Sequence, residues 1–428
     1  MPGLKPWGTS TNTNFRGALL VNGTVYAVIG TNVFTYSALG GAGVQLVGAL
    51  PGLLPVTMAR NNKALPDIVV VSPGEGAFAI TGAGVVAYPD IDVGQPNAVV
   101  FHRSFFIFTY GDGTTRSSDP NSTNINTLNF ATAESKPDTL YRPIPLGNGQ
   151  LLLCGSTSIE VWGGQNDTGY PFNYIATIGR GIAGSFAIAG QDDGFGKGIF
   201  LVGDDNKVST LDGYQAVPIS VPDLDLRIEN EPDKSLITVS VYVSQGHGMV
   251  VVQAPTWCWE YDTTLQTWNE RKSHLVEYWR GKFPLNAFGM WICGDSKSGA
   301  IAIIDGNTNS EFGDALLIQI DTGPLGAFPQ KIRINTLELY LTKGVGKATG
   351  VDPLETDPDI SIMISRDGGQ TYSNPRVIKI GRQAMTDERV RSSIWGQAQN
   401  QGVRWRLRES APLPFAFMGA DMLSDTLR

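Results

Sequence analysis

Short apolar runs separated by tight polar turns recur along most of the chain. The clearest unit spans residues 247–271, where the β-branched run at 249–252 predicts a buried strand. A Pro-containing break follows, and three aromatic residues then alternate with period two, which predicts a second strand with all rings on one face: Trp257, Trp259 and Tyr261. A polar turn leads to Trp268, where a third strand would begin.

The same strand–turn–strand unit recurs along the chain, with turns centred near residues 23, 75, 103, 156, 205, 255 and 297. Asn22-Gly23 between two apolar runs is the strongest short hairpin signal. The spacing is about 30 to 50 residues, close to the period of β-propeller blades. The short gap between 75 and 103 could mark two units that share a blade. The pattern predicts an all-β chain with a β-propeller of about five to seven degenerate blades.

Interruptions of this rhythm predict the domain organisation. Residues 1–16 are polar and turn-rich and are expected to form an N-terminal arm without a core. Residues 17–342 would contain the propeller, with a polar insertion near 111–142. The Gly-, Pro- and acid-rich residues 343–359 predict a mobile loop. Residues 360–428 predict an additional C-terminal β-module, which could pack on the propeller or close it.

Composition and charge support this view and narrow the function. With 51 Gly, 25 Pro and only 17% charged residues, short strands and turns are favoured over long helices. A net charge of −8 argues against non-specific nucleic-acid binding over the whole surface. Three arginines give the C-terminal module one basic strand face, which predicts contact with an acidic partner such as a neighbouring subunit: Arg404, Arg406 and Arg408.

Membrane insertion and secretion are not expected. No apolar run is long enough to span a bilayer, and the first residues have no hydrophobic segment typical of a secretory signal. Cys154, Cys258 and Cys293 are far apart in the chain, which predicts reduced, buried thiols and no metal cluster.

The residues offer little to a catalytic mechanism. His102, His247 and His274 show no paired metal-ligand spacing. Asp-rich turns near 192, 204 and 223 are better explained by turn chemistry than by calcium binding. The aromatic residues of the clearest unit are interpreted as blade core and not as a sugar-stacking surface: Trp257, Trp259, Tyr261 and Trp268. We therefore predict no enzymatic activity, no catalytic or cofactor-binding residue, no cofactor and no metal site.

One hairpin has a recognisable signature. Five residues resemble the Asp box of sialidases and other propellers: Ser365, Asp367, Gly369, Thr371 and Tyr372. In those proteins the Asp and Thr side chains fix a turn, the glycine takes the bend and the aromatic residue packs beneath. The box there is structural and remote from the active site, so it predicts a hairpin and not an activity.

Four passages in order along residues 140–428 resemble the packaged-DNA stabilisation proteins, also called tail accessory, hub or nozzle proteins, of short-tailed bacteriophages. The passages are Ser158-Ile-Glu-Val-Trp162 with Gly179-Arg-Gly-Ile182, Ile199 to Val208 with Ala216-Val-Pro-Ile-Ser220, Trp257-Cys-Trp-Glu-Tyr-Asp262 with Trp268-Asn-Glu-Arg271, and Ser365-Arg-Asp-Gly-Gly369 with Arg404-Trp-Arg-Leu-Arg408.

The resemblance implies a structural, non-enzymatic virion protein of the tail, assembled in the bacterial host cytoplasm as a homo-hexamer below the portal and head–tail adaptor. Such a ring would continue the DNA channel, help to retain the packaged genome and hold tail fibres, spikes or a needle. An acidic lumen would let double-stranded DNA slide through without sequence-specific contacts. The alternative is a carbohydrate-active propeller, either a sialidase-like hydrolase or a glycan-binding tail protein.

Overall fold

The structure is almost entirely β-sheet. It is a computed structural model that describes residues 1–133, 136, 138–164, 166, 169–326, 330–398 and 402–427. Strand accounts for 51% and helix for 4%, which confirms the predicted all-β class. The chain divides into a propeller unit, Pro6–Lys272 with Val276–Ile304, and a C-terminal unit, Asp305–Arg428 with Met1–Lys5 and Ser273–Leu275.

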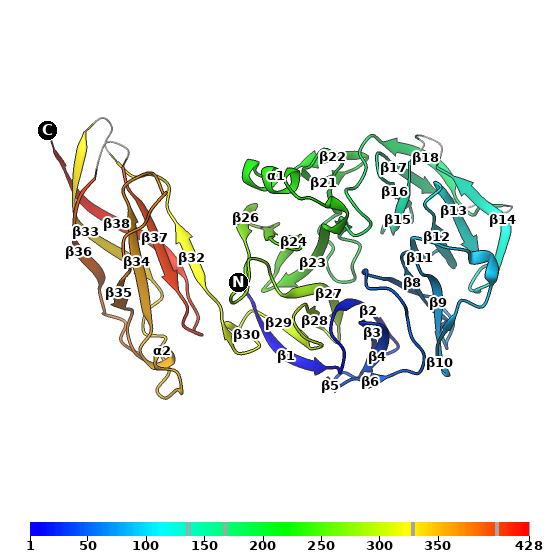
Figure 1. Ribbon diagram of the computed structural model, residues 1–428, viewed down its shortest axis with the longest axis horizontal. Coiled ribbons are helices and arrows are strands. Elements are labelled where there is room, and N and C mark those ends of the chain that lie inside the picture. Colours follow the sequence, from blue (N-terminus) through cyan, green and yellow to red (C-terminus); the bar gives the residue numbers. More distant parts are fainter. Residues whose placement is uncertain are drawn as a thin grey trace. The chain divides into compact units, whose positions relative to one another are not determined.

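The propeller unit has seven blades arranged around a ring in chain order, from blue to yellow-green in Figure 1. The first strand of every blade lines a common central channel, and later strands lie progressively further out. The first six blades are antiparallel sheets: β2, β3, β4 and β6 (Phe15–Val21, Thr24–Ile29, Asn32–Tyr36, Val44–Gln45); β7 to β10 (Thr57–Arg60, Ile68–Ser72, Gly76–Thr81, Gly84–Ala87); β11 to β14 (Ala98–His102, Phe105–Thr109, Thr114–Ser118, Ile125–Thr132); β15 to β18 (Leu140–Pro145, Leu151–Gly155, Ile159–Gly163, Asn173–Ile178); β19 to β22 (Ile188–Ala189, Phe200–Val202, Val208–Asp212, Gln215–Pro218); and β23 to β26 (Thr238–Ser244, His247–Gln253, Cys258–Asp262, Thr267–Glu270).

The seventh blade joins the two ends of the propeller. Three of its strands come late in the chain, and the N-terminal strand β1 (Gly3–Thr9) completes it beside the last of them: β27 (Gly281–Ala287), β28 (Met290–Asp295) and β29 (Ile301–Asp305). The Trp7 ring packs 5.7 Å from that of Tyr36 and 6.1 Å from that of Phe288. The expected arm without a core is therefore wrong for these residues. Their strand takes its core from neighbouring blades, which a local pattern does not reveal.

Seven blades explain the uneven spacing of the predicted turns. The hairpins at residues 22–23 and 103–104 join the first and second strands of their blades, whereas the other turns join the second and third. Both of these two-residue loops have positive φ at each position, as the twist of a tight hairpin requires. The expectation that the turns near 75 and 103 share a blade is therefore wrong.

The segment near 111–142 is not an insertion. Its described part contains β13 and β14, the outer strands of the third blade, and the start of β15, while residues 134, 135 and 137 lie outside the described residues. Two of its buried polar side chains form hydrogen bonds within the sheet, whereas Ser117 Oγ is buried without a partner among the described residues. Thr115 Oγ1 donates to the Phe108 carbonyl at 2.9 Å, and Ser118 Oγ accepts from the Phe106 amide at 3.0 Å. Hydrogen bonding therefore lets a polar sequence form buried strand.

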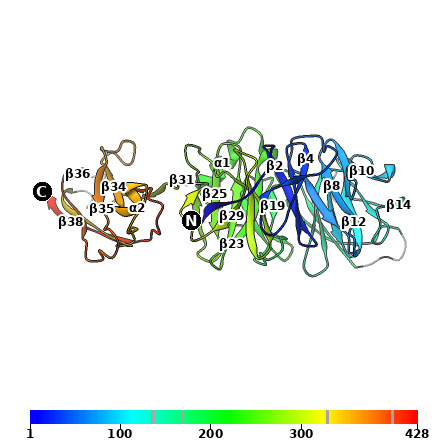
Figure 2. The same ribbon diagram turned by 90° about the horizontal axis from the view of Figure 1, so that it is seen from below.

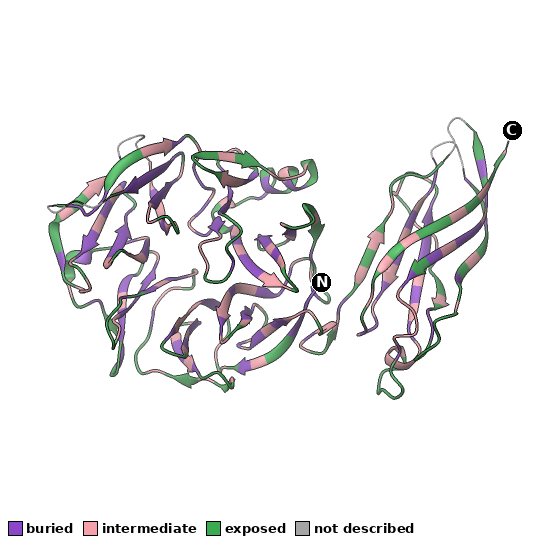
Figure 3. Ribbon diagram, turned by 180° about the vertical axis from the view of Figure 1, so that it is seen from behind, coloured by how far each residue is buried: buried purple, intermediate pink, exposed green. Residues whose placement is uncertain are grey.

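Apolar contacts between blades supply the core of the propeller. Neighbouring sheets share clusters of buried side chains, including one that joins the first and seventh blades around Phe15, Ile292 and Ile301. Figure 3 shows burial concentrated on the inner strands and exposure on the outermost ones, and Figure 2 shows the same blades from the side. The first and seventh blades approach so closely that a Cβ on Gly294 would lie 1.9 Å from Cγ of Phe15.

The C-terminal unit is a β-sandwich of two antiparallel sheets. One contains β32 (Ile318–Asp321), β37 (Arg404–Glu409), β34 (Asp359–Ser365) and β35 (Arg376–Lys379), and the other contains β36 (Val390–Ala398), β33 (Lys331–Leu341) and β38 (Phe417–Leu427). Their facing side chains form one core, in which the Trp395 and Trp405 rings meet edge to face at 4.8 Å. Two short strands, β30 (Ser310–Glu311) and β31 (Asp314–Ala315), precede the sandwich.

The predicted boundaries of the C-terminal module are wrong. The sandwich begins at β32 and not at residue 360, because β32 pairs with β37 and β33 pairs with both β36 and β38. The strands before and after this boundary have the same alternating pattern of apolar and polar residues. Only their long-range pairing shows which strands belong to the propeller and which to the sandwich. Residues 343–359 include the one-turn helix α2 (Pro353–Thr356), capped by Asp352. The mobility expected there stays a prediction. Neither α2 nor α1 (Pro222–Glu229) is long enough to span a membrane, nor is any other helix in the described residues.

Closure of the ring can be tested at Gly294. We expect Gly294→Ala to destabilise the protein by roughly 1–3 kcal/mol, because its methyl group would overlap Phe15. Urea unfolding of the purified protein measures the effect. Gly82→Ala is the matched control, since a Cβ there meets nothing within 4 Å. Equal stability of the two variants would show that the first and seventh blades are less tightly packed than described.

Candidate functional site

The predicted histidines are engaged in ordinary structural contacts or lie apart. The His102 Nε2 atom is 3.0 Å from the Gly149 carbonyl oxygen, and burial lowers the pKa of this ring. The His247 Nδ1 atom is 2.7 Å from Asp262 in the sixth blade, while His274 belongs to the other unit. No group of three or more His, Cys, Asp or Glu side chains is placed to hold a metal ion within the described part of the chain.

The thiols are poor nucleophiles. Cys154, Cys258 and Cys293 are buried and form no disulfide bond, as predicted. Burial raises the pKa of Cys154 and of Cys258 to about 12, although the nearby arginines Arg142 and Arg271 act in the opposite direction. The reactive thiolate form is therefore scarce near neutral pH.

The predicted aromatic residues of the sixth blade are buried or half-buried within its structure. Trp257 precedes β25, and its indole Nε1 donates to Glu231 Oε2 at 2.9 Å. Tyr261 and Trp268 pair across β25 and β26 with ring centroids 4.9 Å apart. Trp259 lies on the same face as Tyr261 and is half-buried. The rings of Tyr261 and Trp268 thus contact each other, and their arrangement favours a packing role over sugar stacking.

The opposite face of this blade carries a buried charge cluster that sequence reasoning missed. The guanidinium of Arg271 donates to Glu260 Oε1 at 2.7 Å and to the Tyr242 hydroxyl at 2.6 Å, and the Tyr242 hydroxyl also donates to Glu260. The Arg271 guanidinium carbon lies 4.1 Å from the centroid of the Trp279 ring. All four side chains are at most 1% exposed. One sequence feature could have indicated this cluster: the charged Glu260 alternates with aromatic residues in a predicted strand.

The predicted Asp-box residues form one compact turn in the sandwich. Ser365 Oγ donates to Asp367 Oδ1 at 2.7 Å and accepts from the Gly369 amide at 2.9 Å, while the Thr371 amide donates to Asp367. The hydrogen bond that the Thr371 hydroxyl donates to Asp367, together with those from the Thr371 amide and Ser365 Oγ, lowers the pKa of Asp367. The Tyr372 ring lies 3.9 Å below the guanidinium carbon of Arg406. The turn holds a hairpin and presents no acid–base pair.

The basic strand β37 is partly neutralised by its neighbours. Arg406 makes two hydrogen bonds of 2.8 Å to Asp321 of β32, and Arg408 donates to Gln319 at 2.8 Å. Arg404 Nε is buried without a hydrogen-bond partner among the described residues. The predicted contact of this face with an acidic partner stays a prediction.

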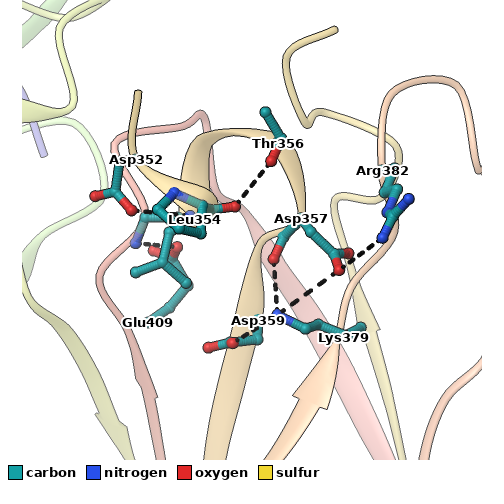
Figure 4. Close-up of polar contacts among 10 residues, drawn as sticks. Asp352, Leu354, Thr356, Asp357, Asp359, Lys379, Arg382 and Glu409 are labelled. Atoms are coloured by element: carbon teal, nitrogen blue, oxygen red, sulfur yellow. Dashed lines mark hydrogen bonds and ion pairs between the residues drawn. The ribbon is translucent and has the colours of Figure 1, made fainter. Parts of the chain in front are cut away.

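Glu409, at the end of β37, is a buried carboxyl of the sandwich (Figure 4). It is 3% exposed; Oε1 accepts from the Ala411 amide at 2.6 Å, and Oε2 has no hydrogen-bond partner in the described residues. Burial raises the pKa of Glu409 to about 7, and the Asp359 carboxylate adds to the rise against the effect of the Ala411 hydrogen bond. Asp359 itself is paired with Lys379 at 3.0 Å.

The central channel of the propeller is a cavity that brings several blades together. Its volume is about 430 Å³, and the inner strands of all seven blades line it. Most of the lining residues are apolar, but the surface exposed in the cavity is more polar than apolar, and Arg142 of β15 and Asp192, which follows β19, bring opposite charges to it. Hydrogen bonds tie neighbouring inner strands together, such as Val239 N to the Phe186 carbonyl at 2.8 Å and Val99 N to Thr57 Oγ1 at 2.9 Å. The wall of the channel is therefore connected by hydrogen bonds between neighbouring blades.

The charge cluster of the sixth blade predicts a large effect of one substitution. Arg271→Met should destabilise the protein by about 3–5 kcal/mol, because it leaves the Glu260 carboxylate buried without its cationic partner. Urea unfolding measures the loss, and the double variant with Glu260→Gln should lose less than the two single variants together. Arg180→Met, which breaks an exposed pair with Asp204, serves as control and should cost no more than about 1 kcal/mol. Similar losses for the two arginines would contradict the assignment.

Glu409 predicts a pH dependence of the C-terminal unit. Because its pKa is raised in the folded state, the folded form binds the proton more tightly, and stability should fall as pH rises from about 4.5 to about 7. Glu409→Gln should remove on the order of 1–3 kcal/mol of this dependence. Calorimetry of both proteins at about pH 5 and about pH 8 measures it, with the exposed Asp387→Asn as control. An unchanged pH dependence in Glu409→Gln would refute the assignment.

Solved structures similar to this chain are distant. PorZ, an essential bacterial surface component of the type-IX secretion system of Porphyromonas gingivalis, is 12% identical with a TM-score of 0.40 over 78% of this chain and 45% of its own. The computationally designed Ika8 protein is 13% identical (TM-score 0.43; 70% and 99% covered), and the extracellular domain of the putative hybrid two-component system BT3049 from B. thetaiotaomicron is 10% identical (TM-score 0.49; 92% and 49%). The chain thus spans about half the length of PorZ and of the BT3049 domain, and these similarities carry no argument about function. A search of curated proteins found no significant match.

Two family models match the chain in succession. The β-propeller model of bacteriophage P22 Gp10 matches residues 1–309, and the β-sandwich model of the same protein matches residues 318–422. The first match includes the closing strand β1, and the second begins at the first residue of β32, where the sandwich starts. The sequence resemblance to phage DNA-stabilisation proteins and the predicted propeller with an additional β-module are both confirmed. The chain belongs to the family of bacteriophage P22 Gp10, the tail accessory proteins that stabilise packaged phage DNA.

Proposed function

We propose that this structural phage protein assembles as a homo-hexameric ring, the tail hub or nozzle below the portal and head–tail adaptor. The observation that carries the proposal is the match of both units, in order, to the two parts of the P22 Gp10 family. The ring continues the DNA channel, helps to retain the packaged genome and anchors tail fibres, spikes or a needle. The proposal includes a location of the protein in the virion tail and its assembly in the cytoplasm of the bacterial host.

The dimensions of the propeller support a DNA path between copies of the chain. The central channel encloses about 430 Å³, which is the size of a small-molecule site, and it is lined by Arg142, Phe186 and Phe283. A DNA duplex is far larger than such a cavity. The duplex therefore passes through an opening that several subunits surround, and not through an individual propeller.

The charge of the chain suits a surface along which DNA slides. A duplex carries one negative charge per ~1.7 Å of its axis, so a basic lumen would hold it electrostatically. The chain has a net charge of −8, which repels phosphates and favours passage without sequence-specific contacts. The basic face of β37 is then available for an acidic protein surface, such as that of a neighbouring subunit.

A non-enzymatic role is part of the proposal. The cysteine thiols have raised pKa values, and the His247 ring is 2.7 Å from the Asp262 carboxylate. The Asp-box carboxylate is engaged by its own turn. These groups serve the fold, and a sialidase-like reaction finds no specific support in their arrangement.

The hub proposal is tested by native mass measurement of the purified protein, alone and mixed with the phage portal–adaptor complex. We expect the mixture to give an assembly with a hexamer of this chain per portal ring. The mixed sample decides, since a subunit that assembles only on its adaptor would be monomeric alone. A strict monomer that ignores the complex would refute the hub.

A further inference from the structure

The wall of the propeller channel contains charged and aromatic side chains to which the proposed structural role assigns no task. Three groups from three different blades meet in its wall: Arg142 in β15, Phe186 just before β19, and Phe283 in β27. The cavity of about 430 Å³ falls within the usual range for small-molecule sites. All of these residues lie within the propeller unit, so the site exists in a single chain and does not depend on the proposed hub.

Arg142, which is half-buried, differs from the buried arginines of the propeller. Arg16 donates to the Leu54 and Gly30 carbonyls and to Ser72, at 2.6, 3.0 and 2.6 Å, and Arg280 makes a two-pronged pair with Asp295 at 2.8 and 2.7 Å. The side chain of Arg142 makes no hydrogen bond and no ion pair within the residues that the structure describes, although its backbone pairs with β16. Its guanidinium carbon lies 5.2 Å from the centroid of the Phe186 ring. Arginine stays protonated and carries five N–H donors, which here face the channel without an acceptor.

The surroundings of this guanidinium select the shape of a ligand. The Phe186 and Phe283 rings lie 5.8 Å apart at 62°, and apolar side chains continue the wall at Ile188, Val239 and Leu285. Gln191 adds a buried amide oxygen that has no hydrogen-bond partner among the described residues. An anionic group at Arg142 would therefore place an attached flat, apolar body against two aromatic rings.

Asp192 selects the charge of the ligand. Its carboxylate lies near enough to Arg142 for each to influence the pKa of the other, but the two do not form an ion pair. Burial lowers the pKa of Arg142 and raises that of Asp192, which indicates that water solvates neither group well. A single negative charge would gain from Arg142, whereas a second would be repelled by Asp192.

We propose that the propeller channel is a binding site for a small planar monoanion of the aromatic carboxylate class, held by Arg142 and packed against Phe186 and Phe283. The carboxylate accepts paired hydrogen bonds from the guanidinium, as the fork of an arginine allows. The ring of the ligand fills the apolar part of the channel.

The test uses benzoate as the probe, benzamide as its neutral counterpart and phenyl phosphate as a more highly charged one, each titrated into the full chain by calorimetry and ligand-observed NMR. Benzoate should bind with a Kd of about 1 mM, as expected for so small a ligand. Benzamide and phenyl phosphate should each bind about tenfold more weakly or worse. Arg142→Gln should weaken benzoate binding by a similar factor, and the exposed Arg180→Gln should leave it unchanged.

Arg142→Lys is a second variant that keeps the charge but loses the fork. It should bind benzoate with intermediate affinity, which distinguishes loss of the site from loss of the fold, and the unfolding transition of each variant is measured in parallel. Absence of benzoate binding, equal binding of benzoate and benzamide, or full affinity in a folded Arg142→Gln protein would each overturn the proposal. Tighter binding of phenyl phosphate than of benzoate would overturn the monoanion assignment.

Discussion

Ring closure is the constraint on which the propeller depends. A blade has two apolar faces, and each face must be covered by a neighbouring blade to keep it from water. The buried clusters of this chain follow that rule, since they lie between successive blades, including the last and the first. A ring of blades satisfies every face only when the last sheet meets the first. β1 secures that meeting, because it adds an N-terminal strand to a sheet built from residues near the end of the propeller.

Within the closed ring, buried charges hold separate strands and loops together through hydrogen bonds and ion pairs. Arg16 gathers the loop between the first two blades by its carbonyls, and Arg271 joins the third strand of the sixth blade to its first through Glu260 and Tyr242. Such groups specify one arrangement, since any shift would leave a charge buried without a partner. Arg142 in the channel, and Arg404 and Glu409 in the sandwich, are less completely matched. Arg404 and Glu409 each carry a buried atom without a hydrogen-bond partner among the described residues, and the Arg142 guanidinium lies against the Phe186 ring.

The sequence predicts the local elements of this fold better than its long-range partnerships. Asn22-Gly23 and the Asp-box residues encode their turns in neighbouring side chains, and alternating aromatic residues encode a strand face. The arm at 1–16, the insertion near 111–142 and the boundary at 360 failed for a common reason. A strand is defined by the partner it pairs with, and these partners lie far away in the chain. The channel site could not be predicted from the sequence for the same reason, because Arg142 and Phe283 come together only after the ring forms.

The closing strand also determines when the propeller can finish folding during synthesis. β1 is translated well before β29, which it must join and which follows almost 300 residues later, at Ile301–Asp305. At a synthesis rate of about 5–20 residues per second, β1 waits roughly 15–60 s for that partner. Its edge is open for pairing with other chains throughout that time. The propeller is thus complete only when its last blade has been translated, which makes the nascent chain, more than the finished subunit, the form most in need of protection by chaperones.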